Sequence, residues 1–213
     1  MSHVSEPRFR VAHGLRLKGF AVVPVLAEVV GLELPHVEQH LDELAAEGHA
    51  KYREGRISGW ALTGEGRKLH HEACSVELDR SGAADRVSNS YRRFLDLNAP
   101  LLAACTDWQL RSGAAGGAQV LNDHEDADYD RAVVGRLAEI DDQVQPIVAD
   151  LTDALHRFEP YGRRLAAARA RVEAGEQDWF TGAMVESYHT VWFELHEDLL
   201  VTLGLERAAE PAV

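Results

Sequence analysis

The chain has 213 residues, of which 46% are hydrophobic and 27% are charged, and its formal net charge is −13. It is long enough to bury a real core in one or two domains, and no apolar run approaches the roughly 20 residues of a membrane span. Residues 1–10 are polar, so we expect neither a signal peptide nor a membrane contact. The only cysteines, Cys74 and Cys105, stand at no metal-ligand spacing, which favours a reduced, cytoplasmic setting.

The negative charge is concentrated in the later part of the chain. Residues 1–80 hold 10 Lys/Arg and 12 Asp/Glu, whereas residues 81–213 hold 12 and 23. An acidic protein can still bind nucleic acid through a local basic face, because affinity depends on the few cations near phosphates. A strongly negative second part would nevertheless repel the phosphate backbone. The charge is therefore the main sequence evidence against nucleic-acid binding.

Three helices are predicted at the start of the chain. The first spans about residues 8–20. The second runs from Pro24 to Val30 and ends at Gly31, which supplies a turn conformation that other residues resist. The third opens at residues 34–35 and stops at Gly48. Its apolar positions, spaced by four and then three, are Val37, Leu41 and Leu44.

A β-hairpin is predicted after these helices, with strands over residues 49–53 and 56–63 and a tight turn at residues 54–55. Its tip is basic. Thr63 is placed as the N-cap of a fourth helix reaching about Arg80, with four apolar positions, Leu69, Ala73, Val76 and Leu78. Residues 81–82 mark the expected boundary between a domain at 1–82 and a second at 83–213.

Several short motifs in this stretch occur together in one order: Ala27 with Gly31-Leu32, the apolar set Val37, Leu41 and Leu44, then Glu47-Gly48, and the segment Leu62-Thr63-Gly64-Glu65-Gly66-Arg67. With them, residues 8–80 resemble the MarR-type, and more loosely the PadR-type, winged helix-turn-helix transcriptional regulators. The resemblance implies a mainly α fold with a two-stranded β-wing. It also implies a double-stranded DNA partner, and a homodimer would match a palindromic site.

In that family pattern, the second helix of the motif enters the major groove. The side chains that flank Val37, and that we expect to contact base edges, are His36, Gln39 and His40. The wing cations Lys51, Arg53 and Arg56 suit the DNA backbone. The same helix also carries acidic side chains, which face phosphates badly: Glu38, Asp42 and Glu43. The alternative is a winged helix that no longer binds DNA and serves as a protein- or ligand-binding adaptor.

The second half reads as a bundle of four or five helices that dimerises, senses a small molecule, or does both. Helices are expected over 83–97, 101–111, 128–158, 161–174 and 179–203. The first pair is interrupted at residues 98–100, and the long third helix is kinked or ended at Pro146. Residues 112–119 are rich in Gly and Ala and are expected to form a loop.

Aromatic and histidine residues of the second half predict an effector pocket between helices. Its expected lining is Trp108, His124, Tyr188, His189 and Trp192; the alternative is a packed aromatic core. A third hypothesis is a bundle enzyme with a metal at Glu186, His189 and His196. The second half holds no second Glu-x-x-His, which argues against it. No catalytic motif is recognisable, so we expect no enzyme, no metal and no cofactor.

Overall fold

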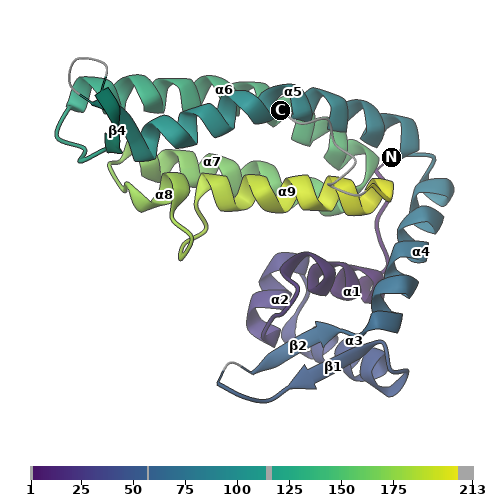
Figure 1. The fold of residues 1–213 in the computed structure, drawn as a ribbon. Helices are drawn as coiled ribbons and strands as arrows, with labels where there is room; N and C mark the ends of the chain where they lie inside the picture. The colour runs from purple at the N-terminus through teal and green to yellow at the C-terminus, as the bar shows by residue number, and fades with distance from the viewer. Residues whose placement is uncertain (1, 57, 114–116, 206–213) are drawn as a thin grey trace. The chain divides into compact units, whose positions relative to one another are not determined.

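The computed structural model describes residues 2–56, 58–113 and 117–205. This part of the chain is mainly helical and holds two small antiparallel sheets, each of two strands (Figure 1). It divides into two compact units. The first contains the described residues up to Val87, then Thr152–Arg157 and residues 197–205. The second contains the described residues from Ser88 to Leu151 and Phe158–His196.

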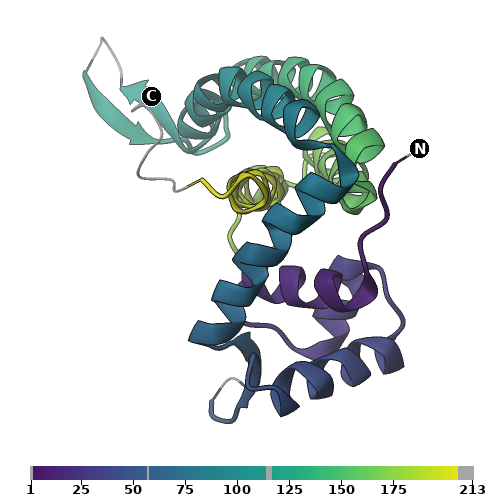
Figure 2. The same cartoon turned by 90° about the vertical axis from the view of Figure 1, so that its right-hand side faces the viewer.

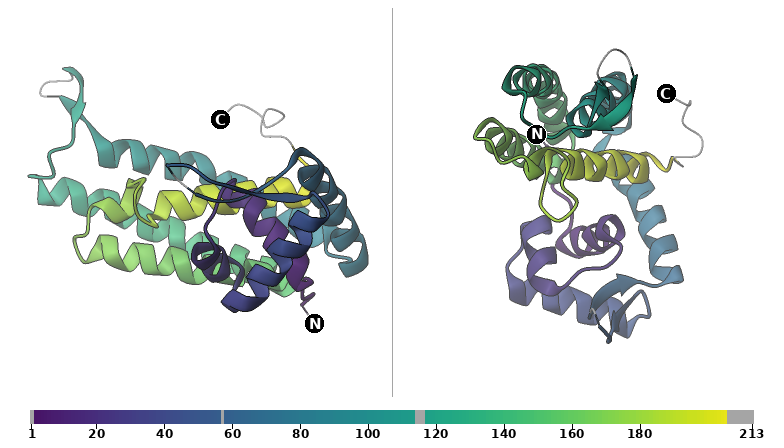
Figure 3. Two further views of the ribbon diagram at one scale, coloured as in Figure 1. Left: turned by 90° about the horizontal axis from the view of Figure 1, so that it is seen from below. Right: turned by 60° about the vertical axis from the view of Figure 1, so that its left-hand side comes forward.

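The first unit begins with three short helices that pack on one another and on a hairpin (Figure 3). These elements are α1 (Pro7–Lys18), α2 (Val23–Val30), α3 (Leu34–Ala46), β1 (Ala50–Arg53) and β2 (Gly59–Leu62). Each helix has a proline in its first turn, where no backbone N–H is needed. The predicted apolar face of α3 is confirmed, since Val37, Leu41 and Leu44 are buried. Gly31 ends α2 at φ 62°, the left-handed conformation that its residue type permits.

The hairpin differs in detail from its sequence prediction. Its strands pair from Ala50 opposite Leu62 to Arg53 opposite Gly59, so the connection is longer than the two-residue turn expected. Residue 57, within that connection, lies outside the described residues. Ala50 is buried, but Tyr52 is 51% exposed and packs edge-on against Trp60. The backbone of Trp60 also exchanges two hydrogen bonds with Ala21, which attaches the hairpin to the α1–α2 connection.

Helix α4 (Gly64–Ser81) begins as predicted, but its buried face does not follow apolarity. Thr63 caps it by accepting a hydrogen bond from Gly66 N at 3.0 Å. Leu69 and Val76, expected in the core, are 42% and 45% exposed. The buried side is mostly polar and consists of His70, Cys74, Glu77 and Leu78. The prediction was wrong because these polar groups are paired with one another and with other segments of the unit, a fact that no periodicity reveals.

The rest of the described chain is built on long helices, which form most of the second unit and, at residues 84–87, 152–154 and 197–203, part of the first. They are α5 (Ala84–Gln109), α6 (Ala127–Ala154), α7 (Glu159–Glu173) and α9 (Tyr188–Leu203), with a 3-10 turn η2 (His156–Phe158) and a short α8 (Asp178–Thr181) between them. Helices α5 and α6 lie side by side (Figure 2). None of the helices in the described ranges has both the length and the apolar content that crossing a bilayer requires.

Two expected interruptions are absent from the long helices. Helix α5 continues through Pro100 and α6 continues through Pro146. Both prolines are exposed, whereas their neighbours Leu101 and Ile147 are buried. A proline removes one backbone donor from a helix, and here packing on both sides of each proline keeps the helical path.

The structure also differs from two further predictions, the loop at 112–119 and the single last helix. Strands β3 (Leu110–Gly113) and β4 (Gly117–Leu121) form a second antiparallel hairpin there, and residues 114–116 lie outside the described part. The last predicted helix is two helices, α8 and α9. Ser187, between them, accepts a hydrogen bond from Thr190 N at 3.2 Å and so caps α9.

Gly66 is the position in α4 at which the fold tolerates no side chain. A Cβ added there would lie 1.9 Å from the carbonyl oxygen of His49, whereas a Cβ on Gly64 would meet nothing within 4 Å. We therefore expect Gly66→Ala to destabilise the protein by about 2–3 kcal/mol, because backbone must move. Gly64→Ala should be neutral or slightly stabilising. Urea unfolding of both variants measures this, and equal effects would contradict the close approach.

Candidate functional site

The outward side of α3 is open to solvent. His36, Glu38 and Gln39 are all exposed, while Val37 between them is buried in the core of the first unit. This follows from the helical period, which turns residues adjacent to a buried position away from it. The structure therefore places two of the three side chains predicted to reach base edges on one accessible surface, and His40, the third, is half-buried.

Two of these side chains are engaged by one carboxylate. Gln39 donates to Glu43 Oε1 at 2.9 Å, and His40 Nδ1 lies 2.9 Å from Glu43 Oε2. The hydrogen bond from His40, and then that from Gln39, hold the pKa of Glu43 below its ordinary value. The side chain of His36 forms no hydrogen bond or ion pair with the described residues. Base contact by Gln39 or His40 would thus begin with release from Glu43.

The three hairpin cations are exposed and unpaired within the described chain. Lys51, Arg53 and Arg56 form no ion pair with any residue that the structure describes. Other surface cations of this unit do: Arg8 binds Glu47, and Lys68 binds Glu65 at 2.9 Å. The hairpin, which packs against α3 through β1, therefore presents positive charge that no described carboxylate neutralises.

The predicted effector residues lie in packed aromatic clusters. Trp108 contacts His124 and Phe180 with ring centroids 4.5 and 4.9 Å apart. His124 Nδ1 is 2.9 Å from Asp130 Oδ2. Asn122 donates to the same Asp130 and is itself buried, so this end of the unit is closed by hydrogen bonds.

Tyr188 and Trp192, two of the other predicted lining residues, belong to a second cluster. Tyr188 is fully buried and donates to Asp141 Oδ1 at 3.1 Å, and Trp192 donates to Asn98 Oδ1 at 3.1 Å while stacking on Phe94. His189 is half-buried, and burial lowers its pKa. These contacts suit the alternative of a packed aromatic core, and an effector role for the five residues stays a prediction.

An open depression on the second unit involves different residues. Its lining is polar and acidic: Arg111, Asp123, Glu125, Asp126, Ala127 and Asp128. None of the five predicted pocket residues contributes to it.

Glu186, His189 and His196, the residues of the metal hypothesis, do not form a compact ligand set in the described part of the chain. Glu186 accepts a hydrogen bond from Arg164 at 2.6 Å, and His196 packs its ring against Phe94. Within the described ranges, one set of three donors is close enough to hold a metal ion, and it lies in the first unit: His13, His70 and Cys74.

A buried ionic network in the first unit was not foreseen from the sequence. Arg157 bonds Asp198 Oδ1 at 2.5 Å through Nη1 and Glu77 Oε2 at 3.1 Å through Nε. Their side chains are 5%, 2% and 6% exposed. Arg157 also donates to Thr202 Oγ1 at 2.6 Å. The members come from α4, the 152–157 segment and α9, and no local spacing in the sequence links such distant positions.

The pKa directions of Arg157 and Asp198 both favour the charged forms. Burial alone lowers the pKa of Arg157, but the carboxylates of Asp198 and Glu77 outweigh it and raise that pKa above its ordinary value. Burial alone raises the pKa of Asp198, but Arg157 and then His13 bring it well below its usual range. The network is therefore a set of mutually dependent charges.

Comparison with protein-family models, with curated proteins and with solved structures finds no match to this chain.

We expect Arg157→Met to destabilise the protein by about 3–5 kcal/mol, because it leaves two buried carboxylates without their cation. The matched control is Arg93→Met, which removes an arginine that pairs with Asp150 at 2.5 Å on an exposed surface. That change should cost about 1 kcal/mol or less. Chemical unfolding at neutral pH measures the free energy of unfolding of both variants. A similarly small decrease in both would show that the buried ion pairs of Arg157 stabilise the protein no more than an exposed pair does.

Proposed function

We propose that the protein is a DNA-binding transcriptional regulator whose first unit is a winged helix-turn-helix. Helices α2 and α3 form the helix-turn-helix, α3 enters the major groove, and the β1–β2 hairpin is the wing. His36, Gln39 and His40 face base edges, and Lys51, Arg53 and Arg56 contact the phosphate backbone.

The observation that carries this proposal is the pairing of an open helix face with a cationic hairpin. The outward side of α3 is exposed, and β1 packs beside it. Lys51, Arg53 and Arg56 have no described counter-ion, so contact with phosphate would break no ion pair with the described chain. Neutralising phosphates releases condensed counter-ions, which is the main source of affinity for a basic surface on DNA.

The remaining parts of the proposal concern assembly and location. A homodimer would match a palindromic operator with half-sites about one DNA turn apart. The second unit would serve dimerisation, binding of a small-molecule effector, or both, in a cytoplasmic protein. These parts rest on the resemblance of residues 8–80 rather than on a contact in the structure.

A triple variant, Lys51→Ala with Arg53→Ala and Arg56→Ala, tests the wing. We expect a loss of affinity for a labelled duplex carrying the DNA upstream of the protein's own gene. The slope of log K against log salt should fall by about 0.9 for each phosphate contact removed. Fluorescence anisotropy over a series of salt concentrations measures both quantities.

The matched control removes three exposed arginines from the second unit, Arg92, Arg131 and Arg163. It changes the net charge equally, so it separates wing contacts from the overall charge of the protein. We expect its salt slope to stay close to that of the parent. If both triple variants bound the duplex as the parent does, the phosphate role of the hairpin would be wrong.

Glu43 is expected to restrain DNA binding. Glu43→Ala removes a negative charge from the α3 face and also releases Gln39 and His40, so affinity for the same duplex should rise. Glu38→Ala is the control, because Glu38 is an exposed carboxylate on the same helix that holds neither side chain. A gain in Glu43→Ala that exceeds the gain in Glu38→Ala supports release. Equal gains in affinity in the two variants would show that only the loss of negative charge matters, and that the release of Gln39 and His40 does not.

A second candidate function is a protein-contact module, and the charge of α3 favours it. Glu33, Glu38 and Asp42 are exposed on this helix beside Glu43, and an acidic surface suits a basic protein partner. The duplex titration discriminates between the candidates: a protein-contact module would show no salt-dependent binding to DNA, with or without the hairpin cations.

A further inference from the structure

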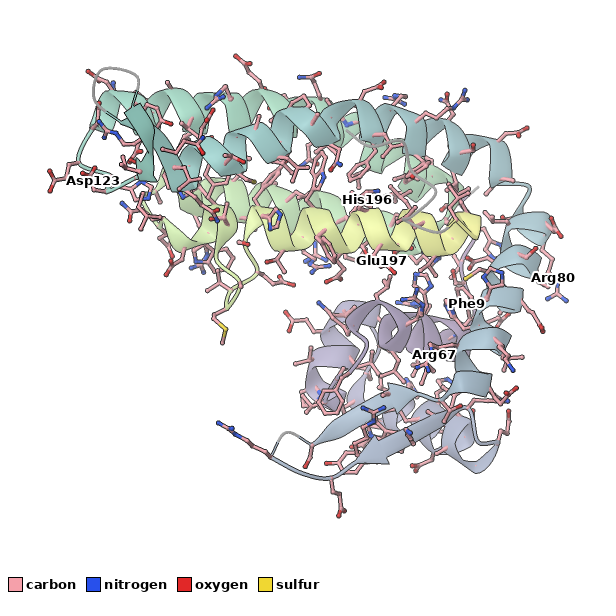
Figure 4. The ribbon with its side chains drawn as sticks, in the orientation of Figure 1. Phe9, Arg67, Arg80, Asp123, His196 and Glu197 are labelled. Carbon is pink, nitrogen blue, oxygen red and sulfur yellow. The ribbon has the colours of Figure 1, made fainter. Side chains whose placement is uncertain are left out.

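Three metal-ligating side chains meet in the interior of the first unit, away from the α3 surface. His13 comes from α1, and His70 and Cys74 come from one face of α4, four residues apart. All three are buried. The ring of Phe9, labelled in Figure 4, stacks on both imidazoles with centroids 5.5 and 5.6 Å away. The donors therefore lie in a shielded environment that the proposed DNA contact does not use.

The donor atoms lie slightly closer together than the edges of a tetrahedral metal site. His13 Nδ1 lies 2.9 Å from His70 Nε2, and Cys74 Sγ lies 3.5 Å from the same Nε2. The three donors all fall within 4.8 Å of one another. With Zn–N near 2.1 Å and Zn–S near 2.3 Å, the edges of a tetrahedral site are about 3.4 Å between nitrogens and about 3.6 Å from nitrogen to sulfur. Small shifts of the rings are enough to reach these values.

Asp198 orients the first ligand. Its Oδ1 is 2.9 Å from His13 Nε2, the ring nitrogen opposite the one that faces His70. The same Nε2 lies 3.0 Å from Nη1 of Arg157. In the tautomer that donates from Nε2 to Asp198, the lone pair of Nδ1 is directed at the cluster. A carboxylate behind a ligating histidine is the usual support of a metal-bound imidazole, since it sets the tautomer and the ring orientation.

The neighbouring charges also suit a cation with a thiolate. The formal charges of Glu77, Arg157 and Asp198 sum to −1 when His13 is neutral, the form in which an imidazole binds a metal. A dication bound by a Cys74 thiolate and two neutral imidazoles adds +1, so the buried set becomes neutral, which lowers the cost of burying its charges.

We propose that His13, His70 and Cys74 form a binding site for one borderline-soft transition-metal ion of the Zn²⁺ type. Two imidazoles and one thiolate are the donors, and Asp198 is the positioning residue behind His13. A water molecule or a small ligand completes the tetrahedron. On binding, the thiol proton of Cys74 leaves to solvent as the sulfur–metal bond forms. The ion joins α1 to α4. This site is independent of the proposed DNA contact and remains testable if that contact is absent.

The experiment uses the full chain, purified under reducing conditions and stripped with a chelator. Titration with Co²⁺ should produce one equivalent of a tetrahedral spectrum that includes a thiolate-to-cobalt charge-transfer band, and one equivalent of Zn²⁺ should abolish it. Zn²⁺ should also raise the thermal midpoint by about 5 °C when its free concentration is about 100-fold above Kd. Excess chelator should reverse the rise.

Cysteine variants identify the sulfur. Cys74→Ser should lose the charge-transfer band. Cys105→Ser should keep it, because Cys105 is the other buried free cysteine and belongs to the second unit. Asp198→Asn should keep the band with metal affinity reduced about 10–100-fold, as removal of an orienting carboxylate does elsewhere.

Several outcomes would overturn the site. They are a parent chain that takes up no Co²⁺, a bound ion without a thiolate band, or a band that survives in Cys74→Ser. If Cys74→Ser does not fold, the parent chain alone decides the question, through the band, the stoichiometry and the reversible shift in midpoint.

Discussion

One buried guanidinium holds the first unit together. Arg157 binds carboxylates from α4 and α9 and a hydroxyl from α9. Each charge in this set would be costly to bury without the others. Segments 152–157 and 197–205 therefore belong with the first 87 residues, although at least 64 residues separate them from it in the chain. A protein truncated at residue 82 would keep the buried Glu77 but lose Arg157, the cation that neutralises it. The proposed DNA-binding unit therefore depends on residues far beyond the helix-turn-helix stretch.

The surface proposed to contact DNA, which consists of the exposed side of α3 and the β1–β2 hairpin, carries both acidic and basic side chains. Glu43 holds Gln39 and His40 with hydrogen bonds of the same kind that a base edge would offer. An exchange of one set of hydrogen bonds for another contributes little net free energy. On this proposal, affinity comes from the cations of the hairpin. Specificity comes from the arrangement of hydrogen-bonding groups on a base edge, which differs from that of a carboxylate. An acidic α3 makes non-specific attraction weak, so it would favour discrimination over tight general binding.

Local patterns predicted the local structure of this chain well. Three features that depend on neighbouring residues are found as expected. They are the end of α2 at Gly31, the N-cap of α4 at Thr63, and the buried face of α3 formed by Val37, Leu41 and Leu44. Helices α5 and α6 continue through Pro100 and Pro146, although a break at Pro100 and a kink or an end at Pro146 were expected. Apolar periodicity failed on α4, where polar residues are buried. For the candidate site, the sequence identified the open face and the free cations of the hairpin. It did not reveal that Glu43 forms hydrogen bonds with Gln39 and His40. The spacings that allow these bonds, four residues from Gln39 and three from His40, are nevertheless visible in the sequence.

The buried cluster shows which kind of information a single sequence lacks. His70 and Cys74 stand four residues apart, a helical spacing that brings two ligands to one face, and this half of the cluster was readable. His13 lies 57 residues earlier, and Asp198 lies 128 residues after His70. Their contact with α4 depends on tertiary packing alone.

One face of α4 connects the two features of this unit. Gly66 rests on the His49 carbonyl at the start of the hairpin, and Thr63 bonds the carbonyls of Gly48 and His49. Four and eight residues further along the helix come His70 and Cys74. A helix is stiff over this distance, so the packing of α4 at the cluster contributes to the position of the hairpin, together with the backbone hydrogen bonds between Trp60 and Ala21. A chemical change among His13, His70 and Cys74 would act on that packing, without touching the exposed surface at all.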